Sequence, residues 1–299
     1  MLKSNNMKVS VIVPVYNEEK CLESCLASLN KQTISTEIIV IDDGSTDGSA
    51  KFATYKQKHQ GPGAARNLGA SKAKGDILVF VDADMEFEPD FIEKLVVPIV
   101  SGIAIGSYST EEYLLNKDKP LAKCWNLNFN RSKEKMDPRG FAIKATGLYG
   151  IGKNVLEKIE GCKASENKNR VFRAILKSKF QEAGGFDTKV GYTDDWTISQ
   201  KLNEFPVAVN DAVYYHCSPE SFLEVWKQAR WYGKNTFLTK NLIRKLYNLW
   251  RYFPLSAVFK GLYGASRYKE SQFLFFKITF DTAVFVSIVL SFFGEQKAR

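Results

Sequence analysis

The sequence lacks the features that mark disulfide-rich, repetitive or low-complexity proteins. Its 299 residues hold only five cysteines, an odd number whose spacing matches no zinc or thiol-redox pattern. This scarcity favours a reducing compartment. No repeat of fixed period and no low-complexity segment occurs. Residues 1–7 include no apolar stretch of signal-peptide length, so we expect no secretion signal there.

Net charge is absent from most of the chain. Residues 1–220 carry 29 Lys and Arg against 29 Asp and Glu, whereas residues 221–299 carry 13 against 4. The same tail holds 19 of the 39 aromatic residues. Basic and aromatic side chains together are typical of surfaces that meet membrane headgroups. We therefore expect a membrane surface as the tail's partner and, since no recognisable motif is present, no nucleic acid. A helical face docked on protein is the simpler alternative.

Hydrophobic patterning predicts alternating strands and helices in the first hundred residues. Short apolar runs at 9–13, 37–41 and 77–81 read as buried strands. Helical patterns follow at 18–32, 45–58 and 64–74, and another helix opens at 89–90. This alternation predicts a parallel sheet whose ligands bind beyond the carboxyl ends of its strands. Further along we expect a strand at 103–106, a helix at 194–202, a strand at 207–209 and helices after 219.

Acidic residues follow two of these strands directly. In Asp82-Ala83-Asp84, two carboxylates could share a divalent cation, and oxygen ligands suit Mg²⁺ or Mn²⁺. In Asp42-Asp43-Gly44-Ser45, a carboxylate could accept hydrogen bonds from a nucleobase. Taken singly, each motif has a simpler interpretation: a surface turn for the first and a helix cap for the second.

Four motifs in order carry a resemblance to a known family. They are Pro14-Val15-Tyr16-Asn17-Glu18, Asp42-Asp43-Gly44-Ser45-Thr46-Asp47, Ala65-Arg66-Asn67-Leu68-Gly69 and Asp82-Ala83-Asp84. Their order and spacing resemble glycosyltransferase family 2 proteins of the GT-A fold over about residues 8–235. The resemblance implies a Rossmann-like, mostly parallel α/β sheet flanked by helices. It also implies a catalytic domain at 1–220, with a nucleotide-binding half at 7–100 and an acceptor half at 101–220. Composition and patterning then predict a basic, aromatic helical tail at 221–299.

The resemblance assigns roles in binding a UDP- or GDP-sugar. The residues implied in donor binding are Pro14, Tyr16, Glu18, Asp43, Arg66, Asp82 and Asp84. Among these, Asp43 matches the residue that reads the base, Asp82 lies near the ribose, and Asp84 holds Mn²⁺ or Mg²⁺ on the diphosphate. A metal there would neutralise the diphosphate and stabilise the departing nucleotide.

A later segment resembles the acceptor side of the family. It comprises Gly184-Gly185-Phe186-Asp187 and Gly191-Tyr192-Thr193-Asp194-Asp195-Trp196. The family pattern is Glu-Asp where this chain has Asp194-Asp195, and its second acid is the catalytic base. Asp195 is therefore expected to take the proton of the acceptor hydroxyl, with Asp194 and Trp196 beside the acceptor. A helix start capped by two acids is the simpler alternative.

Two further features qualify the resemblance. His216 follows an expected strand, and some relatives place an additional metal ligand there; a histidine satisfied by backbone partners is the alternative. Gln228-Ala229-Arg230-Trp231 is one residue short of the QxxRW signature of processive relatives, which argues against a polymerising enzyme.

The C-terminal apolar segment, 273–293, contains two charges, Lys277 and Asp281, that could pair on one helix face. Its uninterrupted apolar part, 282–293, is too short to cross a bilayer. We expect a helix lying in the membrane interface rather than a span, with a helix packed on the catalytic domain as the third alternative.

The resemblance and the tail together predict a metal-dependent transfer of a sugar from a nucleotide sugar at the cytoplasmic face of a membrane. Most proteins of the family that the chain resembles invert configuration by one direct displacement, which is the mechanism we expect, whereas a few similar relatives retain it, so retention is the alternative. The expected acceptor is lipid-linked or an envelope glycan. A polyprenyl-phosphate sugar synthase is the alternative enzyme, and an inactive sugar-nucleotide binder or scaffold is the alternative outside catalysis.

Overall fold

The computed structural model describes residues 7–129, 135–136, 171–188, 195–236 and 242–293. The chain divides into two compact units. The first combines residues up to Asn116 with Arg170–Cys217, and the second combines Lys117–Asn169 with Ser218–Lys297. The division of roles expected at residue 220 stays a prediction.

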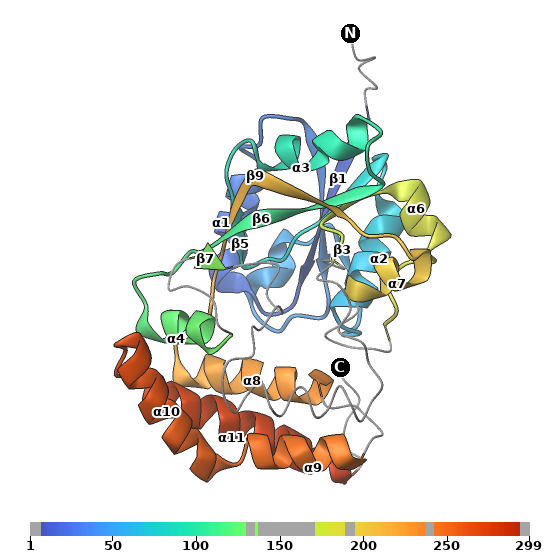
Figure 1. Cartoon of the computed structure of the whole chain (residues 1–299). Coiled ribbons are helices and arrows are strands. Elements are labelled where there is room, and N and C mark those ends of the chain that lie inside the picture. Colours follow the sequence, from blue (N-terminus) through green and yellow to red (C-terminus); the bar gives the residue numbers. More distant parts are fainter. Residues whose placement is uncertain (1–6, 130–134, 137–170, 189–194, 237–241, 294–299) are drawn as a thin grey trace. The chain divides into compact units, whose positions relative to one another are not determined.

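The first unit is a mixed sheet with helices on both faces (Figure 1). Its strands run in the order β3-β2-β1-β4-β8-β6-β9-β5. Neighbours are parallel from β3 to β4 and between β6 and β9, while β8 and β5 run antiparallel to their partners. Its elements are β1 (Val9–Val15), α1 (Glu19–Leu29), β2 (Thr36–Asp42), η1 (Gly48–Phe52), β3 (Tyr55–Lys56), α2 (Pro62–Lys72), β4 (Ile77–Phe80), β5 (Met85–Phe87), α3 (Phe91–Val100), β6 (Gly106–Leu114), β8 (Ala174–Leu176), α6 (Lys177–Glu182), α7 (Thr197–Leu202) and β9 (Val207–His216).

Each face of this sheet is covered by its own helices. Val11 and Val13 point to one face, where they join the cluster that contains side chains of α1 and α3. Ile12 points to the other, among side chains of α2, α6 and α7. Because successive side chains of a strand alternate between faces, a sheet covered on both sides needs an unbroken apolar run, as β1 has. The mixed α/β architecture of the expected GT-A fold is confirmed.

Two expected elements differ from the structure. The helix predicted at 45–58 is the short 3₁₀ helix η1 followed by β3, because Thr54 N donates to Val40 O and Gln57 N to Asp42 O, pairing this segment with β2. The strand predicted at 103–106 begins only at Gly106. Ile103 N and Ala104 N both donate to Pro98 O, so these residues still belong to the turn that ends α3.

The second unit is helical. Its elements are α4 (Pro120–Asn128), β7 (Lys135–Met136), α8 (Phe222–Thr236), α9 (Leu242–Arg251), α10 (Pro254–Tyr268) and α11 (Phe273–Phe292). α11 packs on α4, α8, α9 and α10, and its side chains Phe276, Phe280 and Val284 are fully buried. By length and composition, α11 is the one helix among the described residues that could cross a membrane, and less than half of its apolar window is buried.

Candidate active site

The loops that carry the predicted motifs meet at one edge of the sheet. β1 lies between β2 and β4 and is parallel to both, in a register that pairs Val15 with Asp42 and Ile12 with Phe80. The carboxyl ends of parallel neighbours lie at the same edge. The segments that begin at Tyr16, Asp43 and Val81 therefore leave the sheet together.

The loops after β1 and β2 are fastened to each other. Asn17 N donates to Ser45 Oγ at 3.0 Å, and Thr46 N donates back to Asn17 Oδ1 at 2.8 Å. Asn17 has a φ of 57°, the left-handed region that asparagine tolerates better than most residues. Glu18 N donates to Ser49 Oγ at 2.9 Å. These bonds fix the backbone on which Pro14, Tyr16 and Glu18 stand.

Asp43 is buried, and its carboxylate is surrounded by polar groups of residues 57–61. Oδ1 accepts from Gln57 Nε2 at 2.6 Å and from Gln60 N at 2.8 Å, and Oδ2 accepts from Gly61 N at 2.8 Å. His59 Nδ1 lies 2.9 Å from Oδ2. A carboxylate offers about four acceptor positions, so all of them are used here. A base could reach Asp43 only by replacing the Gln57 or His59 side chain.

The ring of Tyr16 lies on that of His59, with 4.1 Å between ring centroids and an angle of 26° between the planes. Tyr16 is 43% exposed. The structure thus brings Tyr16 and Asp43 to the same ring, His59, which the sequence analysis did not include in the site. The sequence could not have predicted a role for His59, because a histidine in a polar loop looks the same whether it is solvated or part of a site.

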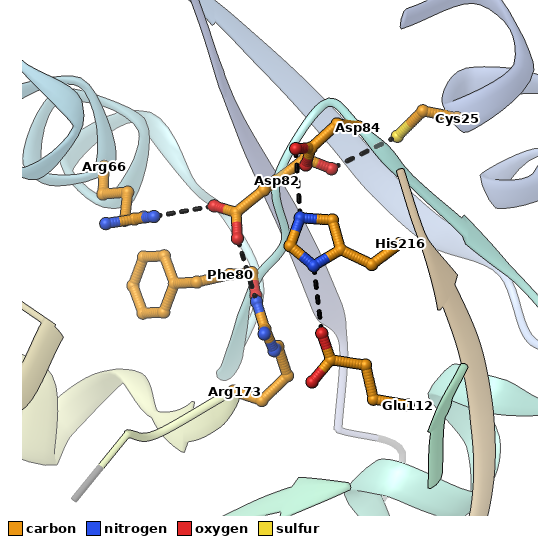
Figure 2. A network of polar contacts seen from close by, with 8 residues as sticks. All are labelled: Cys25, Arg66, Phe80, Asp82, Asp84, Glu112, Arg173 and His216. Carbon is orange, nitrogen blue, oxygen red and sulfur yellow. Dashed lines mark hydrogen bonds and ion pairs between the residues drawn. The ribbon is translucent and has the colours of Figure 1, made fainter. Parts of the chain in front are cut away.

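Two arginines hold the first carboxylate of the Asp82-Ala83-Asp84 motif (Figure 2). Arg66 Nη2, from α2, lies 2.7 Å from Asp82 Oδ1, and Arg173 Nη1 lies 3.5 Å from Oδ2. Burial alone would raise the pKa of Asp82, but the two guanidinium groups outweigh it and hold that pKa well below its usual range. Arg173, just before β8, was missed because no motif surrounds it.

The second carboxylate of the motif forms a chain with His216 and Glu112 (Figure 2). His216 Nε2 lies 3.0 Å from Asp84 Oδ2, and His216 Nδ1 lies 3.0 Å from Glu112 Oε1. Strand register explains the arrangement, because His216 pairs with Met85 of β5 and with Leu114 of β6. Burial would lower the pKa of His216, but Asp84 and Glu112 raise it well above the usual value.

The Asp84 and His216 pair fits one side of a divalent metal site. Asp84 Oδ1 is buried and has no hydrogen-bond partner in the described part of the chain, an uncommon state for a carboxylate oxygen. Burial, and after it the nearby charge of Asp84, raises the pKa of Glu18 to about 8. Glu112 would orient the histidine through its other nitrogen, a common arrangement around metal-bound histidine.

No group of three potential ligands gathers anywhere in the described residues. The chain would therefore supply two ligands, and a substrate would have to supply the rest, as diphosphates usually do for Mg²⁺.

The acceptor-side segment is tied to the donor side through α2. Asn67, next to Arg66, accepts from Phe186 N at 2.9 Å and donates to Phe186 O at 3.0 Å. Asp187 N then donates to Thr197 Oγ1 at 3.0 Å, at the start of α7. Asp195 and Trp196 immediately precede that helix and are half-buried. Asp194 lies outside the described residues.

Comparison with known proteins identifies the family of the chain. The model of the family "Glycosyl transferase family 2" matches residues 10–160. Glycosyltransferase GlyA from Streptococcus pneumoniae serotype 4 is 40% identical over 116 residues, which are 34% of this chain and 17% of that protein. The dolichol-phosphate mannosyltransferase of Pyrococcus furiosus is 38% identical over 116 residues, 34% of this chain and 33% of that protein. The aligned part thus spans a third or less of either relative.

Among the solved structures that cover nearly the whole chain is one with a TM-score above 0.5. It is the mannosyltransferase PcManGT from Pyrobaculum calidifontis in complex with GDP-Man and Mn²⁺, with a TM-score of 0.54 and 17% identity, over 97% of this chain and 88% of that one. At this identity the likeness concerns the fold. The family model, in contrast, covers half of the chain, including the segments that carry Tyr16, Asp43, Arg66, Asp82 and Asp84. The chain belongs to glycosyl transferase family 2.

Proposed function

We propose that the chain transfers a sugar from a nucleoside-diphosphate sugar to an acceptor with the help of a divalent metal. The observation that carries the proposal is the polar chain Asp84–His216–Glu112, in which a buried carboxylate oxygen of Asp84 is left without a partner. Family membership supports the reaction class, and the relatives above are glycosyltransferases by name.

Asp84 and His216 would hold Mn²⁺ or Mg²⁺. When bound, the metal supplies positive charge to the donor diphosphate and to the departing nucleotide. The complex of PcManGT with GDP-Man and Mn²⁺ supports a metal in a protein of this fold. Arg66 and Arg173 both form ion pairs with Asp82 and keep its carboxylate ionised. Because two guanidinium groups face one carboxylate, the three side chains together carry positive charge.

The donor nucleotide would lie along the loops that follow β1 and β2. Tyr16 offers an exposed ring on which a base can stack, with Pro14 near the end of β1 and Glu18 just before α1. Asp43 would act on the base either directly, after Gln57 or His59 has moved, or by holding residues 57–61 in place. Both uridine and guanosine nucleotides remain candidates.

Asp195 would take the proton of the acceptor hydroxyl as its oxygen attacks the anomeric carbon. One base and one direct displacement give inversion of configuration at that carbon. Asp194 and Trp196 would lie on the acceptor side. The link from Asn67 through Phe186 to Thr197 supports this placement, since it ties α2, which carries Arg66, to the start of α7.

The proposed acceptor is lipid-linked or an envelope glycan, used at the cytoplasmic face of a membrane. The basic, aromatic tail supports a membrane location. A second candidate function is a polyprenyl-phosphate sugar synthase, which the similarity to dolichol-phosphate mannosyltransferase favours. Its phosphate acceptor would need no strong base, so the two candidates differ in their need for Asp195.

Thermal unfolding in the presence of nucleotides tests the donor site. UDP, GDP, ADP and CDP would be compared with and without Mn²⁺ on the wild type, Asp84→Ala and Asp118→Ala. A ligand that binds only the native state raises the melting temperature. We expect one nucleotide to raise it only with Mn²⁺, in the wild type and in the exposed-site control Asp118→Ala but not in Asp84→Ala. Folded wild type that responds to no nucleotide would contradict the proposal.

A further inference from the structure

Helix α9 presents its apolar side outward. Leu242, Ile243, Leu246 and Trp250 fall on one face at helical spacing, and all four are exposed, Trp250 by 73%. The opposite side buries a polar residue, Asn248, at 4% exposure. An amphipathic helix of a soluble protein normally turns its apolar stripe toward the core. In α9 the apolar stripe instead faces away from the other described helices of the second unit.

Helix α10 repeats this arrangement. Leu255, Phe259, Leu262 and Tyr263 form one exposed stripe, with Phe259 at 74%. The other side of α10 carries Gly261 and Gly264, which let its backbone approach Phe273 and Leu274 of α11. Phe253, in the turn that joins the two helices, is also exposed. Single exposed apolar residues are ordinary, but whole exposed helix faces mark an interaction surface.

One cation contacts this surface, and others stand close to it in the sequence. The Arg267 guanidinium carbon lies 5.9 Å from the centre of the exposed Tyr263 ring. Arg251 ends α9, and Lys245 and Lys269 belong to the same stretch. The surrounding tail, residues 221–299, has 13 basic against 4 acidic residues. A surface that combines Trp, Tyr and Phe with Lys and Arg suits a membrane whose interior is apolar and whose headgroups are negatively charged.

Helix α11, which we expected to lie in the membrane interface, makes contacts typical of a core helix along one side, although less than half of its apolar window is buried. Asp281 in its middle is fully buried and forms ion pairs with Lys260 of α10 and Lys277 of α11 itself. Ser287 accepts from Arg230 Nε of α8 at 2.9 Å. Such contacts belong to a helix held between α8 and α10, where Gly233 and Gly264 leave room for it.

We propose that the exposed apolar faces of α9 and α10 insert into the headgroup layer of an anionic membrane, and that α11 is the protein core beneath them. The chain then lies on the membrane and does not span it. This inference deepens the membrane location of the proposed function, but it rests on the second unit alone. It makes α9 and α10 the contact with lipid, and Trp250 and Phe259 the side chains that enter deepest.

Vesicle flotation tests the inference. Full-length protein would be floated with vesicles of phosphatidylcholine alone or with added phosphatidylglycerol, comparing the wild type, Trp250→Ala/Phe259→Ala, and the control Val97→Ala/Ile103→Ala. The control removes two exposed apolar side chains of the first unit. We expect binding to the anionic vesicles, at least tenfold weaker binding by the α9–α10 variant, and no change in the control. High salt should weaken wild-type binding, because exposed charges are screened.

Three results of these experiments, and a fourth from membrane extraction, would overturn the inference. The first three are folded wild type that ignores anionic vesicles, an α9–α10 variant that binds as well as wild type, and wild type that forms a dimer which the variant loses, since the occupant would then be a second copy. Membrane-bound chain that resists extraction by alkaline carbonate would restore α11 as a span. Nucleotide binding, measured by thermal unfolding on the same samples, separates this failure from failure of the proposed function.

Discussion

Asp195 is the residue whose role separates the two candidate reactions. We expect Asp195→Asn to lower kcat by roughly 100- to 10,000-fold, the range that a lost general base usually costs. Donor binding should stay unchanged, because the base acts on the acceptor. The measurement is release of nucleoside diphosphate from the donor whose nucleotide stabilises the protein, in the presence of a membrane lipid extract.

Asp211→Asn serves as the control, since it changes an exposed aspartate of β9 in the same way. A variant at position 195 that keeps most of its rate would contradict the role as base. That result would favour the polyprenyl-phosphate sugar synthase, whose acceptor already carries a negative charge.

Residues within motifs were easier to predict than their partners. Asp82 and Asp84 follow a strand, and His216 ends one, so their type and position indicate chemistry. Arg173 and Glu112 carry no such signal: one contacts Asp82 and the other His216 only because β8, β6 and β9 lie side by side in a particular register. Contacts between residues about a hundred positions apart cannot be predicted from the local sequence pattern.

At the scale of elements, the packing of α10 on α11 depends on a missing side chain. A Cβ at Gly264 would come 2.3 Å from Phe273 Cε1, and Phe273 is itself buried. We expect Gly264→Ala to lower the free energy of unfolding by about 1–3 kcal/mol, the usual cost of overpacking, although alanine favours helix by roughly 0.5–1 kcal/mol. Urea unfolding measures the change.

Ser266→Ala is the matched control, because Ser266 is exposed on the same helix. It should leave stability unchanged or raise it slightly. A Gly264→Ala variant as stable as this control would mean that α10 and α11 do not pack as closely as the structure shows.

Elements with strong periodicity were predicted well, and those set by distant pairing were not. The strands at 9–13, 37–41 and 77–81 and the helix at 64–74 agree with β1, β2, β4 and α2. The segment 45–58 has helical composition, but edge pairing with β2 takes its backbone hydrogen bonds. The expected pair of Lys277 and Asp281 does form, at 2.8 Å, because four residues separate neighbours on one helix face.

At the scale of the whole molecule, the family motifs were sufficient to predict the fold class. The charge pattern also distinguished the basic tail from the neutral remainder of the chain. Composition alone could not say which tail helix is core. α11 is the most apolar and is therefore the obvious candidate for the membrane. Its packing on α8 and α10, with glycines at the contacts and a buried ion pair, is the reason why we propose it as a core helix instead.

The most direct test of the central claim, that Asp84 and His216 hold the metal on a donor diphosphate, is pulsed electron paramagnetic resonance of Mn²⁺ with the nucleotide that stabilises the protein. A histidine ligand produces nitrogen modulation in this spectrum. We predict that signal in the wild type, its loss in His216→Ala, and its retention in His59→Ala, which removes the only other histidine of the chain. Bound Mn²⁺ without nitrogen modulation in the wild type, or with the modulation kept in His216→Ala, would contradict the account.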